Sequence, residues 1–156
     1  NSLATMIFFA LFFVGGSAGS TSGGVKIVGH IIMIKNSILE FKKLIHPNAI
    51  IPVRINGKSV PPQIISNILA FVVFYMLITI ASTVVISALG YDLDTSLGAV
   101  AATLGNIGPG IGRVGPVENY AHIPTFGKWF LSFLMLIGRL ELFTVIVLFS
   151  PSFWKK

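Results

Sequence analysis

The residues best suited to chemistry in this chain are the glycines and the proline of segment 105–112, which reads Gly-Asn-Ile-Gly-Pro-Gly-Ile-Gly. Glycine and proline stop a helix and allow backbone carbonyl groups to turn toward one point. The uncharged segment 95–104 precedes it, and Asp92 and Asp94 lie where acidic residues favour a helix N-terminus. The C-terminal end of such a helix carries partial negative charge. The pattern therefore predicts a carbonyl-lined site for a cation; the alternative is a loop that merely packs within a helix bundle.

A second tract of small residues, 15–24, reads Gly-Gly-Ser-Ala-Gly-Ser-Thr-Ser-Gly-Gly and lies between apolar runs. Each glycine costs a helix interior about 1 kcal/mol relative to alanine, so a continuous helix is not expected here. Lipid cannot satisfy the freed backbone groups, which must be buried in protein or line a watery cavity. We interpret the tract as a break in a membrane helix where passage is controlled. Close helix packing through small residues is the alternative.

Neither tract fits a nucleotide-binding motif. Two glycines of tract 15–24 have phosphate-loop spacing, but Val25 stands where that motif requires lysine. Segment 110–115 matches the glycine spacing of a dinucleotide fingerprint, but no strand precedes it and Pro116 follows where a helix should begin. The histidines and acids are scattered, without the spacing of a metal site or a catalytic pair. No enzymatic activity is expected.

Arg139 is the most informative charged residue, because it lies in the middle of the apolar segment 134–143. An unpaired charge at membrane depth is costly and marks a functional position by default. Glu141 is two residues away, about 200° around a helix, and does not face Arg139. A positively charged side chain below an ion-selective filter would act as a barrier or latch. A buried structural ion pair is the alternative.

The composition indicates an integral membrane protein. Of the 156 residues, 54% are hydrophobic and 10% are charged, and the mean hydropathy is +0.88. Apolar surface on this scale needs lipid as its solvent. Segments 64–89 and 129–149 are each long enough to cross a bilayer. Segment 95–104 is too short to cross and is best explained as a re-entrant helix between them.

The formal net charge of +6 is concentrated in two regions. Most basic residues lie between the first and second long apolar segments, with Glu40 as the only acid there, and two more end the chain. This is the distribution of the positive-inside rule, so segment 35–62 and the C-terminus are predicted to be cytoplasmic. It also explains the charge without a nucleic-acid partner. The basic residues concerned are Lys26, Lys35, Lys42, Lys43, Arg54, Lys58, Lys155 and Lys156.

Four regions, in order along the chain, together resemble the Trk/Ktr/HKT superfamily of potassium transporters, and the Trk branch most closely. The family fold is an all-α integral membrane fold, with four repeats of span, pore helix, filter and span around one central pore of the potassium-channel-like type. The resemblance implies that this chain holds about one and a half of the four repeats. The matching regions are 15–26, 44–49, 104–112, and 138–144 with 151–154.

The resemblance also implies a division of the chain. Residues 1–46 would be the second span of repeat three, broken by an intramembrane gating loop, residues 47–61 a cytoplasmic linker, and residues 62–156 repeat four. Repeat four would consist of the span 64–89, the pore helix 95–104, the filter segment 105–112 and the span 129–149.

The same resemblance assigns the site residues. The filter maps to Asn106, Ile107, Gly108, Pro109 and Gly110, and potassium would bind backbone carbonyls near Gly108. Arg139 matches the family arginine that faces the gating loop and latches it. The gating loop consists of Gly15, Gly16, Ser17, Ala18, Gly19, Ser20, Thr21, Ser22, Gly23 and Gly24.

We therefore expect potassium uptake across the bacterial cytoplasmic (inner) membrane by a multi-pass protein without a cofactor. The resemblance implies a homodimer and a cytoplasmic ring of nucleotide-binding regulatory subunits of the RCK/KTN type, which touches the basic loop 35–58. Because the chain opens at Asn1 rather than Met, N-terminal repeats of the same polypeptide are expected to complete the pore. The alternative is a truncated or assembly-only membrane fragment with no transport activity by itself.

Overall fold

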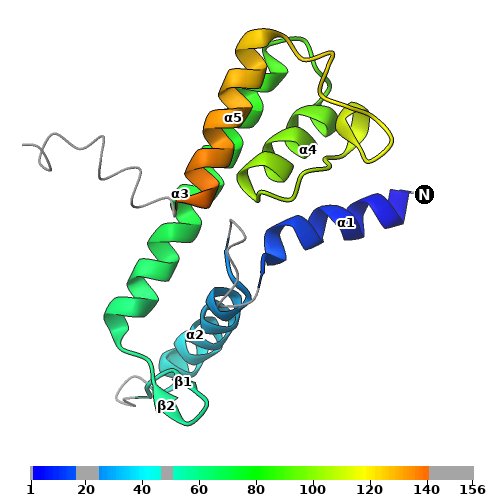
Figure 1. Cartoon of the computed structure of the whole chain (residues 1–156). Helices are drawn as coiled ribbons and strands as arrows, with labels where there is room; N and C mark the ends of the chain where they lie inside the picture. Colours follow the sequence, from blue (N-terminus) through cyan, green and yellow to red (C-terminus); the bar gives the residue numbers. More distant parts are fainter. Residues whose placement is uncertain (1, 17–24, 47–50, 141–156) are drawn as a thin grey trace, which may run out of the picture.

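The computed structural model describes residues 2–16, 25–46 and 51–140, and this part of the chain is mostly helical (Figure 1). A short β-hairpin accompanies the helices at one end of α3 (Figure 1). In chain order the elements are α1 (Ser2–Val14), α2 (Ile27–Ile45), β1 (Arg54–Ile55), β2 (Lys58–Ser59), α3 (Pro62–Ser87), α4 (Leu93–Leu104), the 3-10 turn η1 (Gly112–Val114) and α5 (Thr125–Arg139).

The longest described element is α3, a 26-residue helix. It begins at Pro62, where the missing N–H of proline costs no hydrogen bond. Among the described residues it is the one helix long and apolar enough to cross a membrane. Large aliphatic side chains remain exposed along one side, including Leu77, Ile80 and Val84. Such a surface is suited to lipid rather than water.

The opposite face of α3 carries its buried residues, among them hydroxyl groups. The Oγ1 atom of Thr79 donates to the carbonyl oxygen of Tyr75 at 2.8 Å, and that of Thr83 donates to the carbonyl oxygen of Thr79 at 2.7 Å. These bonds within the helix satisfy hydroxyls that lipid or a dry core could not. The buried face of α3 comprises Tyr75, Thr79, Ser82, Thr83 and Ile86.

The short helix α4 packs against both α3 and α5, beside the upper part of α3 in Figure 1. Its 12 residues span about 18 Å, too little to cross a bilayer. Nine of its 12 residues are buried, and Ala99, Val100 and Ala102 have no exposed surface. Small side chains let the neighbouring backbones come close to this helix.

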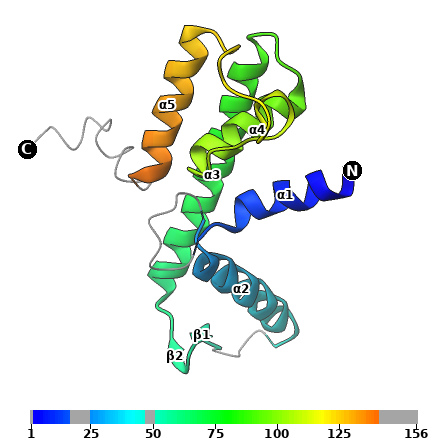
Figure 2. The same cartoon turned by 45° about the vertical axis from the view of Figure 1, so that its right-hand side comes forward.

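The N-terminal part consists of two helices that run in different directions (Figure 2). Helix α1 ends at Val14 and contacts α4, whereas α2 begins at Ile27 and packs against α3. Between them, Gly15 has a φ of +66°, and the N–H of Ile27 donates to the carbonyl oxygen of Gly16 at 3.1 Å. The rest of the small-residue tract, 17–24, lies outside the described residues.

Two elements differ from the sequence-based expectation. The last helix was expected over 129–149, but α5 begins at Thr125, directly after the extended Pro124, and ends at Arg139. Residues 141–149 of the expected span lie outside the described residues. In addition, the expected linker 47–61 contains the hairpin β1–β2, whose turn residues Asn56 and Gly57 both have positive φ. An Asn-Gly pair is typical of such two-residue turns, so the hairpin had a local signal.

Candidate ion-coordination site

The site begins where α4 ends. The N–H groups of Gly105, Asn106 and Ile107 all turn back to carbonyls of the last helical turn, at 2.9 to 3.1 Å. Asn106 has a φ of +54°, a left-handed conformation that asparagine tolerates better than most residues. These bonds cap the C-terminal end of α4. The following residues lie just beyond the C-terminal end of the helix, where its dipole is negative.

Some of the next residues have carbonyls without protein donors among the described residues. Gly108 has a φ of +108°, which in practice only glycine adopts, and among the described residues no atom beyond its chain neighbours lies within 4 Å of where its Cβ would be. Within the described part of the chain, no hydrogen-bond donor meets the carbonyls of Asn106, Ile107 and Pro109. Exposed carbonyls of this kind can replace the hydration shell of a cation. The segment has the chemistry of a coordination site built from backbone oxygens.

The chain then returns along α4 in close contact. A Cβ on Gly98 would lie 2.6 Å from the backbone nitrogen of Ile111, so this crossing requires glycine. The N–H of Gly110 donates to the carbonyl oxygen of Val114 at 2.8 Å. The N–H of Arg113 donates to the Oγ1 atom of Thr95 at 3.1 Å. These contacts tie the return of the loop to the side and the first turn of α4.

Thr95 and Asp92 together build the start of α4. The Oδ2 atom of Asp92 accepts from the backbone nitrogen of Thr95 at 3.1 Å and from its Oγ1 atom at 3.0 Å. The hydrogen bond from the Thr95 hydroxyl is the main cause that lowers the pKa of Asp92 below its ordinary value, and the backbone bond adds to it. The carboxylate therefore caps the helix in its charged form.

Helix α5 holds the other end of α4. The Nδ2 atom of Asn106 donates to the carbonyl oxygen of Met135 at 3.1 Å. Gly138 lies so close to Leu104 that any Cβ there would overlap the Leu104 carbonyl oxygen. The side chain of Asn106 thus has a structural role in addition to the predicted backbone role. Its partner is 29 residues away, and no local pattern signals the pair.

The predicted latch residue lies near this contact. Arg139 is the last residue of α5, one position after Gly138, rather than in the middle of a described helix. The structure thus brings the predicted filter segment and the C-terminal end of α5 together. Of the predicted gating loop, only Gly15 and Gly16 belong to the described residues, and Ser17–Gly24 lie outside them.

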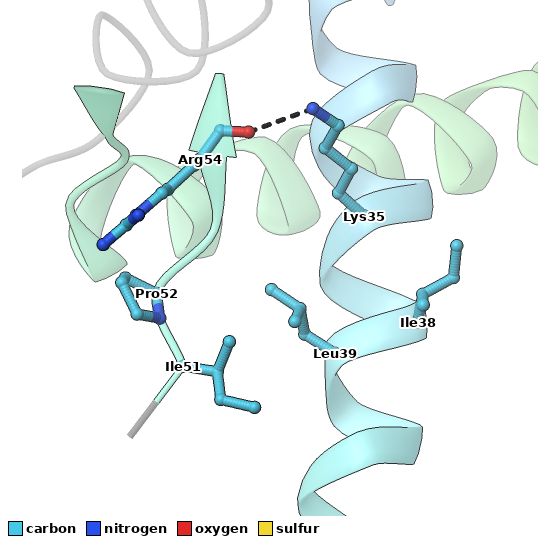
Figure 3. A pocket seen from close by; sticks show the side chains of 6 residues that line it. All are labelled: Lys35, Ile38, Leu39, Ile51, Pro52 and Arg54. Atoms are coloured by element: carbon cyan, nitrogen blue, oxygen red, sulfur yellow. Dashed lines mark hydrogen bonds between the residues drawn. The ribbon is translucent and has the colours of Figure 1, made fainter. Parts of the chain in front are cut away.

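A pocket between α2 and the hairpin lies away from these residues (Figure 3). The Nζ atom of Lys35 donates across it to the carbonyl oxygen of Arg54, at 3.0 Å. Lys35 thereby braces α2 against the hairpin. The lining is mainly aliphatic and contains none of the predicted filter or gate residues: Lys35, Ile38, Leu39, Ile51, Pro52 and Arg54.

The architecture defines a class of protein: a mostly helical membrane protein in which a short buried helix leads into a glycine-rich carbonyl loop. The chain belongs to the TrkH family of cation transport proteins, whose family model matches residues 2–156. The family resemblance read from the sequence is thereby confirmed.

Individual relatives agree with this assignment. The chain is 42% identical over 150 residues to the Trk system potassium uptake protein TrkH of Halomonas elongata, covering 96% of this chain and 31% of that protein. It is 40% identical to TrkH of Escherichia coli K12, covering 92% of this chain and 29% of that protein. The crystal structure of the potassium transporter TrkH from Vibrio parahaemolyticus superimposes with a TM-score of 0.89 at 33% identity, covering 99% of this chain and 33% of that one. The chain thus spans about a third of the length of these relatives and has the TrkH membrane transporter fold over that part.

Proposed function

We propose that this chain forms the C-terminal third of a bacterial potassium transporter, and that Asn106, Ile107, Gly108, Pro109 and Gly110 supply one of four segments of its selectivity filter. The relatives' names as potassium uptake proteins support the transported ion. The transporter lies in the cytoplasmic membrane and uses no cofactor, and potassium is its substrate.

One observation carries the filter assignment. The carbonyls of Asn106, Ile107 and Pro109 meet no donor among the described residues, and they follow directly on the C-terminus of the buried helix α4. Residues 107–109 are exposed on the described part of the chain, so their carbonyls are open to a partner from outside it. A partly dehydrated potassium ion is such a partner, and the negative end of the α4 dipole adds to its attraction.

Replacing Gly108 by serine tests this proposal. In the complete transporter, Gly108→Ser is expected to change both rubidium uptake and the discrimination against sodium, because a φ of +108° strains any residue with a Cβ. Gly90→Ser is the matched control: Gly90 also has positive φ, at +94°, and open space around its Cβ position, but it lies outside the loop. Unchanged uptake and selectivity in Gly108→Ser would contradict the filter assignment.

The gate is the second part of the proposal. Residues 15–24 form a movable loop beneath the filter, and Arg139 latches it. The break between α1 and α2 supports the loop, as does the positive φ of Gly15. The position of Arg139 next to Gly138, which touches the end of α4, supports a place for the arginine close to the filter.

The remaining arrangement follows the family. Residues 1–46 serve as the second span of repeat three and residues 62–156 as repeat four, and repeats elsewhere in the same polypeptide complete the pore. The linker 47–61 and the C-terminus lie in the cytoplasm, in agreement with the basic residues of the linker region. The transporter is a homodimer, and a cytoplasmic ring of nucleotide-binding subunits regulates it.

A second candidate is an assembly-only membrane fragment without transport activity of its own. The chain covers 31% of the Halomonas relative, which fits a piece of a longer transporter as well as a separate fragment. Production of the complete reading frame that contains these 156 residues, in cells that lack potassium uptake, separates the two candidates. Rescue of growth at low potassium would support a part in a larger pore. Absence of rescue by a product that reaches the membrane would support the fragment hypothesis.

A further inference from the structure

One hydrogen bond reaches the predicted filter from a distant part of the chain. The hydroxyl of Tyr120 donates to the carbonyl oxygen of Gly108 at 3.0 Å. Tyr120 lies between η1 and α5, 12 residues after Gly108. It belongs neither to the filter motif nor to the gate. Among the described contacts, this is the one that a side chain makes with a carbonyl of segment 106–110.

The position of the tyrosine is fixed by packing. Its ring is partly buried against the hydrophobic core that α3, α4 and α5 share, and its carbonyl oxygen accepts from the N–H of the buried Ile123 at 3.2 Å. Burial also raises the pKa of the Tyr120 hydroxyl, which remains a donor at neutral pH. A rigid donor can therefore hold its acceptor in one orientation.

Gly108 itself needs such a restraint. Among the described residues, nothing beyond its chain neighbours lies within 4 Å of its Cβ position, and without a side chain its backbone rotates more freely than that of any other residue. A carbonyl oxygen has two lone pairs, so a bond to Tyr120 occupies one and leaves the other for an ion or water. The hydrogen bond thus restrains the peptide without removing it from coordination.

We propose that Tyr120 is a positioning residue, which holds the Gly108 carbonyl in its ion-coordinating orientation and thereby contributes to the discrimination between potassium and sodium. This inference rests on the proposed filter function of segment 106–110. It extends the functional site to a residue outside the filter motif.

The test uses Tyr120→Phe in the complete transporter, because phenylalanine keeps the ring and its packing and removes only the donor. The ratio of rubidium to sodium uptake is measured in the same cells, so the result does not depend on the amount of protein. Loss of one hydrogen bond predicts a fall of about three- to tenfold in this ratio. The matched control is Tyr91→Phe, since the hydroxyl of Tyr91 also donates to a loop carbonyl, that of His122, at 2.8 Å. The ratio of rubidium to sodium uptake in Tyr91→Phe is expected to equal that of the parent.

Gly108→Ser, measured in parallel, separates the failure of this inference from that of the filter assignment. If Gly108→Ser changes the ratio and Tyr120→Phe does not, the filter assignment stands and the role of Tyr120 is overturned. If neither variant changes it, both fail. If Tyr120→Phe lowers only the melting temperature of the purified protein, the tyrosine is a structural residue and the inference is wrong. An equal fall in Tyr91→Phe also overturns it, because the effect would then not depend on the Gly108 carbonyl.

Discussion

The carbonyl oxygen of Leu104 lies directly against the α-carbon of Gly138, so the end of α4 and the last turn of α5 meet where no side chain fits. This contact, together with the bond from Asn106 to Met135, fixes where the glycine-rich loop begins. The carbonyls of the loop can hold a constant geometry only if the helix that carries them does not slide. Gly138 therefore supports the position of the loop that we propose as a filter segment.

Gly138→Ala is expected to push α5 away from α4. Overpacking of this kind costs about 1–3 kcal/mol, because the obstructing atom belongs to the backbone and cannot rotate away. Thermal unfolding of the purified protein in detergent measures the effect. Gly29→Ala in α2 is the control, since its Cβ would meet only side-chain atoms, at 3.3 Å and beyond. An equal loss of stability in both variants would contradict the close contact.

Thr95→Val is expected to release the return of the loop from α4. Thr95 is 1% exposed, and its substitution removes the bonds of its hydroxyl to the N–H of Arg113 and to the carboxylate of Asp92, at a cost of about 1–3 kcal/mol. Thr103→Val is the matched control, because the hydroxyl of Thr103 bonds only to carbonyls of its own helix. The free energy of unfolding of Thr103→Val should fall by less than about 1 kcal/mol. Chemical or thermal unfolding of the two variants side by side makes the comparison, and a larger loss in Thr103→Val would be inconsistent with the tie.

The stability of the protein is expected to fall in acid partly through Asp92. Its pKa is lowered in the folded state, so its contribution is complete above the ordinary carboxyl pKa and is lost as the pH falls through the lower, folded value. Asp92→Asn keeps a capping oxygen but cannot titrate in this range. The melting temperature of this variant should therefore vary less between neutral pH and about pH 3 than that of the parent. Identical pH profiles would show that Asp92 does not contribute.

Arg139→Ala is expected to loosen the gate and leave the filter intact. In the complete transporter, rubidium uptake should rise several-fold under conditions in which the parent is closed, with the ratio of rubidium to sodium uptake unchanged. Arg139→Lys keeps the positive charge, and its rubidium uptake should be close to that of the parent. This variant separates the effect of the charge from that of the shape of the side chain. A change in ion selectivity instead of gating would place Arg139 in the filter rather than in a latch.

Much of the local structure was predictable because it depends on neighbours in the chain. The expected span 64–89 and short helix 95–104 correspond to α3 (Pro62–Ser87) and α4 (Leu93–Leu104), whose ends follow from proline, glycine and a capping aspartate. The hairpin at Arg54–Ser59 was missed although its Asn-Gly turn is a local signal. Apolar runs of sufficient length also indicated membrane helices, whereas the family fold was implied by the resemblance of four regions to the Trk/Ktr/HKT superfamily.

Sequence alone determined the helices and the membrane setting and predicted the carbonyl segment, because hydrophobic length and glycine content act locally on the backbone. Only the tertiary structure decided which groups hold that segment. Tyr120 reaches Gly108 across 12 residues, Asn106 reaches Met135 across 29, and Gly138 meets Leu104. No periodicity marks such pairs, since each depends on how α4 and α5 pack together and not on the residues beside it.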